Sequence, residues 1–248
     1  MDTVILIVIV LLIMVAAGGL GALALRRTER RTIDLTDPID RIDVRLAAGR
    51  LEVSGAAGEA DSGVHVERTA SWVLTRPSIV EEVEGRTLRI SVRGQSLVGR
   101  GGAVDYRISA PASVAVRAVT GAGSIEVDGV DGAIDLGTAA GEIRVRSLAG
   151  PARLDTRMGR IKATGLVGAE MEASSTTGTV ELEFAAPPEH VDVSTSTGSL
   201  VVAVPGGPYR VDARTGAGNT EVGVATDPDA TRSIRARSSA GSVTIRRR

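Results

Sequence analysis

The sequence contains no cysteine, and aromatic residues make up only 2% of its 248 residues. The absence of cysteine excludes a disulfide framework and a thiolate metal site, although it does not set the cellular compartment. So few aromatic residues argue against a glycan groove lined by aromatic platforms, and they favour a thin core of aliphatic side chains. With a formal net charge of −1, the chain gives no reason to expect a nucleic-acid partner.

Motifs for catalysis or cofactor binding are also missing. His65 and His190 each lack neighbours at metal-ligand spacing, and no P-loop or dinucleotide fingerprint follows a strand-like segment. We therefore predict no catalytic, cofactor-binding or metal site. One less favoured alternative concerns Asp192 and Asp212, which occupy equivalent repeat positions and could lie side by side as the paired carboxylates of a carbohydrate-active enzyme.

The sequence does contain a recurring glycine at nearly constant spacing. From Gly123 onward the intervals between successive copies are 18, 18, 19, 20, 20 and 23 residues. A period near this length is typical of architectures in which repeated units stack on one another. The eight copies are Gly49, Gly123, Gly141, Gly159, Gly178, Gly198, Gly218 and Gly241.

Residues on both sides of this glycine alternate between apolar and polar. An apolar residue stands five positions before it, another four positions after it and, except for Thr220, another two positions after it, while Ser or Thr stands three positions before it in all copies but the first. Alternation with a period of two is typical of half-buried strands. Each unit is therefore predicted to be a strand, a glycine turn, a second strand and a second turn. The fold class is all-β, a parallel β-solenoid, with an antiparallel β-meander or sandwich as the alternative.

The position six residues before the recurring glycine is charged in every copy from Gly123 onward. In sequence order these residues are Arg117, Asp135, Arg153, Glu172, Asp192, Asp212 and Arg235. Stacked rungs lie about 4.8 Å apart, so Arg117–Asp135, Asp135–Arg153 and Arg153–Glu172 are expected to pair. We interpret this ladder as a solvated, salt-bridged surface worth at most about 1 kcal/mol per pair.

Residues 4–25 form an uncharged aliphatic run that is long enough to span a bilayer, which needs about 20 residues. No basic region precedes this run and no cleavage site stands out, so we predict an uncleaved single-pass transmembrane helix in contact with lipid. Arginines follow the run directly, and the positive-inside rule therefore favours a cytoplasmic location for the large domain. An extracellular domain is the alternative.

The remaining chain divides by the regularity of its pattern. Residues 1–3 are a short tail before the membrane segment, 26–37 a charged linker, 38–110 irregular N-terminal β coils and 111–248 regular repeats. The last repeat ends in three arginines, and no cap follows it in the sequence. We therefore predict an open C-terminal rung, guarded by these arginines or used for a protein partner or self-association.

The repeats resemble the bacterial DUF4097 family, whose members are called putative adhesins. The resemblance covers roughly residues 39–248 and is carried by residues 106–111, 120–127 and 138–145, which read YRISAP, TGAGSIEV and TAAGEIRV. It implies a β-helix-like domain and a role in surface adhesion, and it brings no catalytic or ligand residues. Our primary prediction is a non-catalytic, membrane-anchored scaffold or protein-interaction module, with a cell-surface adhesin as the alternative.

Overall fold

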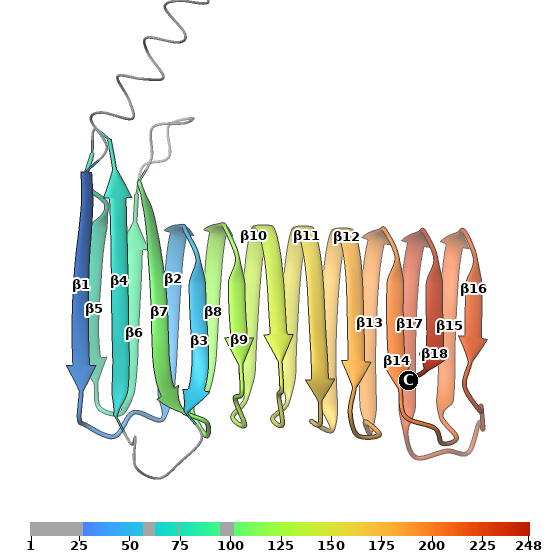
Figure 1. Ribbon diagram of the computed structural model, residues 1–248. Helices are drawn as coiled ribbons and strands as arrows, with labels where there is room; N and C mark the ends of the chain where they lie inside the picture. The colour runs from blue at the N-terminus through green and yellow to red at the C-terminus, as the bar shows by residue number, and fades with distance from the viewer. Residues whose placement is uncertain (1–26, 57–62, 74, 95–101) are drawn as a thin grey trace, which may run out of the picture.

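A computed structural model describes residues 27–56, 63–73, 75–94 and 102–248. The chain is all-β over these ranges, as predicted, and its 18 strands form one continuous mixed sheet (Figure 1). The strands are β1 (Arg27–Leu35), β2 (Arg41–Ala48), β3 (Leu51–Ala56), β4 (Val64–Trp72), β5 (Ser78–Glu84), β6 (Thr87–Arg93), β7 (Ala103–Pro111), β8 (Ala115–Ala122), β9 (Ile125–Asp128), β10 (Ile134–Arg146), β11 (Ala152–Leu166), β12 (Glu170–Phe184), β13 (His190–Thr197), β14 (Leu200–Val204), β15 (Arg210–Ala217), β16 (Thr220–Gly223), β17 (Ser233–Ala240) and β18 (Val243–Arg247).

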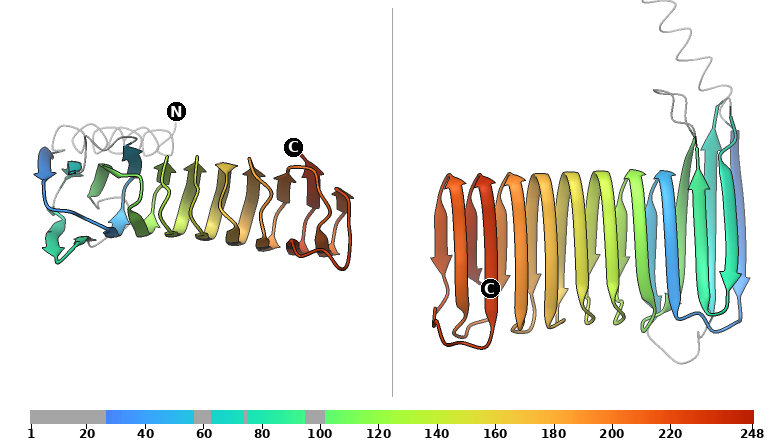
Figure 2. Two further views of the ribbon diagram at one scale, coloured as in Figure 1. Left: turned by 90° about the horizontal axis from the view of Figure 1, so that it is seen from below. Right: turned by 180° about the vertical axis from the view of Figure 1, so that it is seen from behind.

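Each repeat forms one rung, which is a pair of strand segments joined at the recurring glycine. Successive rungs pair in parallel, and identical template positions lie beside each other: Leu136 pairs with Leu154, and Ile143 with Ile161. The rungs from β8 to β18 therefore make a parallel stack (residues 115–248), drawn as a row of nearly identical coils in Figures 1 and 2. The first glycine repeat, β2 with β3, joins the same stack through parallel pairing with β8 and β9.

The recurring glycines form a continuous column through the stack. All eight have φ between +132° and +151°, a region that L side chains rarely adopt. A Cβ added at any of them would lie only 1.6–2.1 Å from a backbone carbonyl oxygen of the adjacent rung or strand, and for Gly159 that atom is the oxygen of Gly141. The glycine is therefore required both by the turn and by the close approach of the neighbouring rung.

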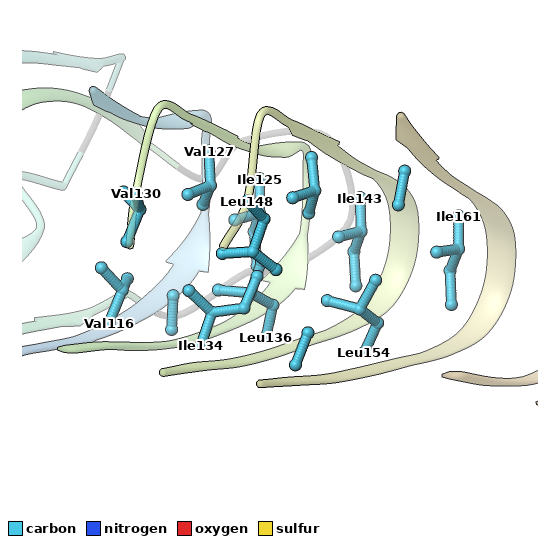
Figure 3. Close-up of a cluster of buried hydrophobic side chains, with 14 of the residues drawn as sticks. Val116, Ile125, Val127, Val130, Ile134, Leu136, Ile143, Leu148, Leu154 and Ile161 are labelled. Carbon is cyan, nitrogen blue, oxygen red and sulfur yellow. The ribbon is translucent and has the colours of Figure 1, made fainter. Parts of the chain in front are cut away.

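The core is the narrow space between the two faces of the stack. Figure 3 shows Ile125, Ile143 and Ile161 on one face pointing toward Leu136 and Leu154 on the other. These five side chains are at most 1% exposed, so alternation in the sequence identified the inward positions correctly. Residues seven positions after the glycine close one side of the core, and they too are at most 1% exposed: Val130, Leu148 and Leu166.

The hydroxyl position three residues before the glycine faces the turn. Thr120 and Thr195 donate to the carbonyl two residues later in their own rung, at 3.4 Å each. Thr138 and Ser238 instead donate across the stack, to the carbonyl oxygen of the recurring glycine of the adjacent rung, at 3.3 Å each. The Ser/Thr column thus adds hydrogen bonds between rungs to the local bonds that such residues make in turns.

The spatial order of the rungs differs from the sequence order at the C-terminal end. The last rung in the sequence, β17 with β18, pairs with β13 and β14 on one side and with β15 and β16 on the other. It is thus inserted one place inside the end of the stack (Figure 1). The prediction that the C-terminal rung is the open one is therefore wrong, because the terminal rung is formed by β15 and β16.

The N-terminal end mixes strand directions, so a wholly parallel β-solenoid is too simple a description. Strands β6 and β7 pair in parallel with β2 and β3, but β1–β4, β4–β7 and β5–β6 are antiparallel. The charged stretch predicted as a linker over 26–37 differs as well, since residues 27–35 form strand β1. Its Ile33 and Leu35 pack against the core while Asp34 between them stays exposed, and this short alternation is obscured by the many charges that precede it.

The predicted membrane-spanning segment at residues 4–25 lies outside the described residues. Within the described ranges, the chain has no helix with the length and apolar character needed to cross a bilayer.

Candidate functional site

The outward charge ladder runs across almost the whole molecule on the face formed by the first strand of each rung. In spatial order its charges alternate with one exception, the neighbouring acids Glu172 and Asp192. The ladder reads Glu82, Arg89, Asp43, Arg117, Asp135, Arg153, Glu172, Asp192, Arg235 and Asp212.

Two of the predicted ladder pairs are ion pairs in the structure. Arg117 and Asp135 approach to 3.4 Å, and Arg153 and Glu172 to 2.7 Å, while Asp135 and Arg153 are neighbours in register. All of these side chains are at least half exposed, so each pair stabilises the fold only weakly. Most charges of the ladder are therefore offset by opposite charges of the same molecule.

Asp192 and Asp212, predicted as neighbouring carboxylates in the enzyme alternative, do not lie side by side. The inserted rung places Arg235 between them, with its guanidinium 3.1 Å from Asp192 and 4.0 Å from Asp212. A hydrogen bond from Arg237 and the charges of neighbouring arginines lower the pKa of Asp212. A glycosidase acid needs the opposite shift, so Asp212 is poorly suited to donate a proton near neutral pH.

A buried charge cluster ties the two faces together at the N-terminal end. Arg68 on β4 is only 4% exposed, and its guanidinium lies 2.9 Å from Glu29 on β1 and 2.9 Å from Glu81 on β5. Tyr106 on β7 donates to the same Glu81 carboxylate at 2.8 Å. Burial, together with the charge of Glu81, raises the pKa of the Tyr106 hydroxyl, which remains a neutral donor. Arg76 lies 2.7 Å from Glu29, so two arginines and two carboxylates balance the charge of the cluster.

A cavity of about 690 Å³ opens beside this cluster, between strands β1 and β4 on one side and β5 and β6 on the other. Its apolar wall includes Ile33, Ile79 and Leu88, and its polar wall includes Arg68 and Glu81. Because the guanidinium of Arg68 already contacts carboxylates, it leaves no uncompensated positive charge for an anionic ligand. The cavity therefore lacks an obvious chemical selectivity.

Both histidines have polar neighbours that the sequence did not reveal. The imidazole of His65 pairs with Asp34, and its other nitrogen lies 3.6 Å from Glu67. The hydrogen bond with Asp34 is the main cause that raises the pKa of His65 above 6.5. His190 lies 3.0 Å from the hydroxyl of Ser233. In the part of the chain that the structure describes, no group of three or more acidic or histidine side chains is placed to hold a metal ion.

The terminal rung is the most distinctive surface of the molecule. In the described ranges, β15 and β16 each have a neighbouring strand on one side only, namely β17 and β18. Val222 on β16 is 39% exposed, whereas the equivalent Val202 and Ile245 of the inner rungs are fully buried. Val211 and Ala213 on β15 are half-buried for the same reason. Inward-facing residues of the repeat are thus left uncovered at this end.

Sequence reasoning missed this surface because it assumed that rungs stack in sequence order. One signal could have revealed it: in sequence order Asp192 and Asp212 would be adjacent, and like charges directly opposite each other destabilise a sheet. Placing the rung that carries Arg235 between them removes this contact. The observed order leaves one like-charged neighbouring pair on the ladder, Glu172 and Asp192, where stacking in sequence order would give two.

Comparison with known proteins gives no family assignment. No family model matches the chain, and no curated protein matches it. Solved structures with a similar outline include a putative cell adhesion protein from Clostridium sporogenes, which is 13% identical with a TM-score of 0.38 and covers 90% of this chain and 100% of its own. A putative adhesin from Bacteroides fragilis is 16% identical with a TM-score of 0.37, covering 90% of this chain and 97% of its own.

A putative lipid-binding protein from Parabacteroides distasonis is 14% identical with a TM-score of 0.32, and it covers 88% of this chain and 96% of its own. Similarities this low carry no argument about function, so the resemblance to DUF4097 stays a resemblance. Function is therefore inferred from the surfaces of this chain, above all the terminal rung of β15 and β16.

Proposed function

We propose that this protein is a non-catalytic, membrane-anchored scaffold that binds protein partners through the open edge of β15 and β16. In this proposal the parallel stack is a β-solenoid that acts as a rigid spacer. The observation that carries the proposal is the incomplete terminal rung, which exposes inward-facing apolar residues together with an unpaired strand edge. Such an edge is a template for strand addition by another chain.

The chemistry of the outer face supports a structural role over a catalytic one. The ladder carboxylates have arginines beside them, and the two that suggested an enzyme are separated by Arg235. The inward positions are filled by aliphatic residues and by the Ser/Thr column, in which Thr138 and Ser238 donate to backbone carbonyls of the adjacent rung. These contacts stabilise the stack and leave few groups available for a reaction.

Anchoring depends on residues 4–25, and the charge that follows them favours a cytoplasmic domain. A reporter fused to the C-terminus tests this part separately, with one reporter active only outside the membrane and one active only inside. Activity of the outside reporter alone would replace the cytoplasmic proposal by the adhesin alternative. Release of the protein into the soluble fraction after cell lysis would contradict anchoring altogether.

Binding through the edge is tested by a photo-crosslinking amino acid placed at Ala213 in the full chain inside cells. Val119, which is 48% exposed on the outer ladder face far from either end, is the matched control position. The proposal predicts a discrete adduct from position 213 and none from position 119. The scaffold proposal would be contradicted by the absence of an adduct from position 213 in cells that express the protein at its natural level.

A further inference from the structure

The backbone hydrogen bonds at the start of β15 show which of its residues direct their N–H and C=O groups to the open edge. The N–H of Arg210 donates to Arg232 next to β17 at 2.9 Å, whereas that of Tyr209 donates to Ala225 on the opposite side at 3.0 Å. Successive residues of a strand direct their backbone groups to opposite sides. The N–H and C=O groups of Val211, Ala213 and Thr215 therefore point to the open edge.

Both ends of this free stretch are bounded. At its start, Tyr209 forms a bridge with Thr226, so the segment after β16 already covers that position. At its end, Gly216 and Ala217 lead into the turn at Gly218. The unpaired stretch therefore runs from residue 211 to residue 215, and Ala213 is its midpoint.

From this geometry we infer that the open edge binds a second copy of this chain, with β15 of the two copies antiparallel about a two-fold axis at Ala213. The inference depends on the proposed function and names its partner. In the inner rungs the same inward positions are covered by another rung of the same template, and a second copy offers such a rung. A two-fold contact is also closed, whereas a head-to-tail contact would continue into a filament.

The charges of the edge fit this arrangement. Pairing about Ala213 places Asp212 of each copy directly opposite Arg214 of the other, on the outer face of the joined sheet. Within one copy Arg214 already contacts Asp212 at 2.7 Å, so the second copy completes a square of alternating charges. Val211 lies opposite the second copy's Thr215 on the inner side, which continues the core of one stack into the next.

The end of the stack is only two strands wide. A contact this narrow is expected to bury less than the roughly 800 Å² per partner that is typical of stable complexes, so we expect reversible association. Confinement of both copies to one bilayer would raise their effective concentration. The test therefore uses the full chain reconstituted in liposomes, and it scores the crosslink separately from the membrane-bound fraction. A failure of anchoring is then distinguishable from a failure of pairing.

The chain has no cysteine, so one substitution provides a unique thiol. Directly opposite residues of an antiparallel pair have Cβ atoms about 5.5 Å apart, within reach of a reagent that bridges two thiols by one methylene group. Ala213→Cys is expected to give a dimer of twice the chain mass, in several-fold higher yield than the exposed control Val119→Cys. Equal yields from the two variants would overturn the inference.

A second variant separates pairing from folding. The N–H of Ala213 points away from β17, so Ala213→Pro removes a donor that the single copy does not use. The circular dichroism spectrum is expected to stay unchanged, while the dissociation constant measured by sedimentation of the full chain in detergent rises about tenfold or more. Unchanged association, or growth of the unsubstituted chain into polymers larger than a dimer, would also overturn the two-fold arrangement.

Discussion

Gly159, one of the recurring glycines, offers the sharpest test of how the rungs are held together. A Cβ at this position would lie 1.7 Å from the carbonyl oxygen of Gly141, and real Cβ atoms essentially never come within 3.0 Å of such an atom. Gly159→Ala must therefore move two rungs apart by about 1.3 Å. This shift stretches the hydrogen bonds between β10 and β11, which pair from residue 134 to residue 146.

The expected cost has two parts. Forcing alanine into a φ of +151° costs about 1 kcal/mol, and weakening two or three backbone hydrogen bonds costs about 1 kcal/mol each. We expect Gly159→Ala to lower the free energy of unfolding by about 3–4 kcal/mol, measured as loss of β-sheet circular dichroism in urea. In a stack of repeats this loss is compared as a shift in the urea midpoint, because such arrays do not always unfold in one step.

Two control variants separate the contributions. Gly85 has a φ of +59° with no atom within 4 Å of an added Cβ, so Gly85→Ala should cost only about 1 kcal/mol. Gly137 has no positive φ and its added Cβ would make an ordinary contact, so Gly137→Ala should be neutral or stabilise by about 0.5 kcal/mol. Equal costs for Gly159→Ala and Gly85→Ala would refute the close-approach argument.

A fourth glycine variant guards against complete loss of folding. Gly218 lies in the terminal rung, where an added Cβ would be 2.1 Å from the oxygen of Gly241. Because no strand of the described ranges pairs with the outer side of β15 and β16, this rung can shift outward. Gly218→Ala should therefore cost less than Gly159→Ala, and a larger cost would contradict the spatial order of the rungs.

The remaining predictions concern buried and titrating groups. Thr138→Val removes a donor to a cross-rung carbonyl and should lower the free energy of unfolding by about 1 kcal/mol, whereas Thr156→Val replaces a buried hydroxyl without a hydrogen-bond partner and should be neutral or stabilising. Arg68→Met leaves two carboxylates facing a buried uncharged side chain, and urea unfolding should show a loss of about 3 kcal/mol. Because the folded-state pKa of His65 is raised, its contribution to stability is complete below pH 6.5 and is lost as the pH rises through the raised value; an NMR titration should show this pKa falling in Asp34→Asn.

Local alternation in the sequence predicted which side chains face inward. Leu136 and Ile143 are buried as their positions require, and the Ser/Thr position is buried in the inner rungs. The exceptions lie in the terminal rung, where Val222 follows the template but remains 39% exposed. Alternation specifies the face of a strand, whereas burial also depends on whether another rung lies beyond it.

Apolar alternation does not reveal the order of the rungs, because every rung presents nearly the same edge to its neighbour; the like charges of Asp192 and Asp212 are a separate hint. What distinguishes the final rungs is the longest interval of the series, 23 residues from Gly218 to Gly241. This interval holds the connection from β16 back to β17, which returns past one rung. No strand was predicted at 27–35, because Ile33 and Leu35, with Asp34 between them, are the only apolar residues of this charged stretch.

The repeat pattern read from the sequence also missed a second feature, which lies on the loop side of the stack. Glycines nine positions after the recurring glycine form another column, in which a Cβ at Gly150 would lie 2.3 Å from the carbonyl oxygen of Gly132. Together with the buried Val130 and Leu148, they close the core where the sequence predicted only a second turn. Glycine at this position recurs in only some of the copies. The pattern read from the sequence therefore ended before the loop that completes each structural unit.

The most direct test of the account is the order of rungs at the C-terminal end, since that order creates the open edge. Ser194 on β13 pairs with Arg237 on β17, which in turn pairs with Arg214 on β15. In the cysteine-free chain, oxidation of Ser194→Cys with Arg237→Cys should form an intramolecular disulfide, and so should Arg237→Cys with Arg214→Cys. Ser194→Cys with Arg214→Cys should not, because a whole rung lies between them. A disulfide in this last pair would show that the rungs stack in sequence order and would contradict the account.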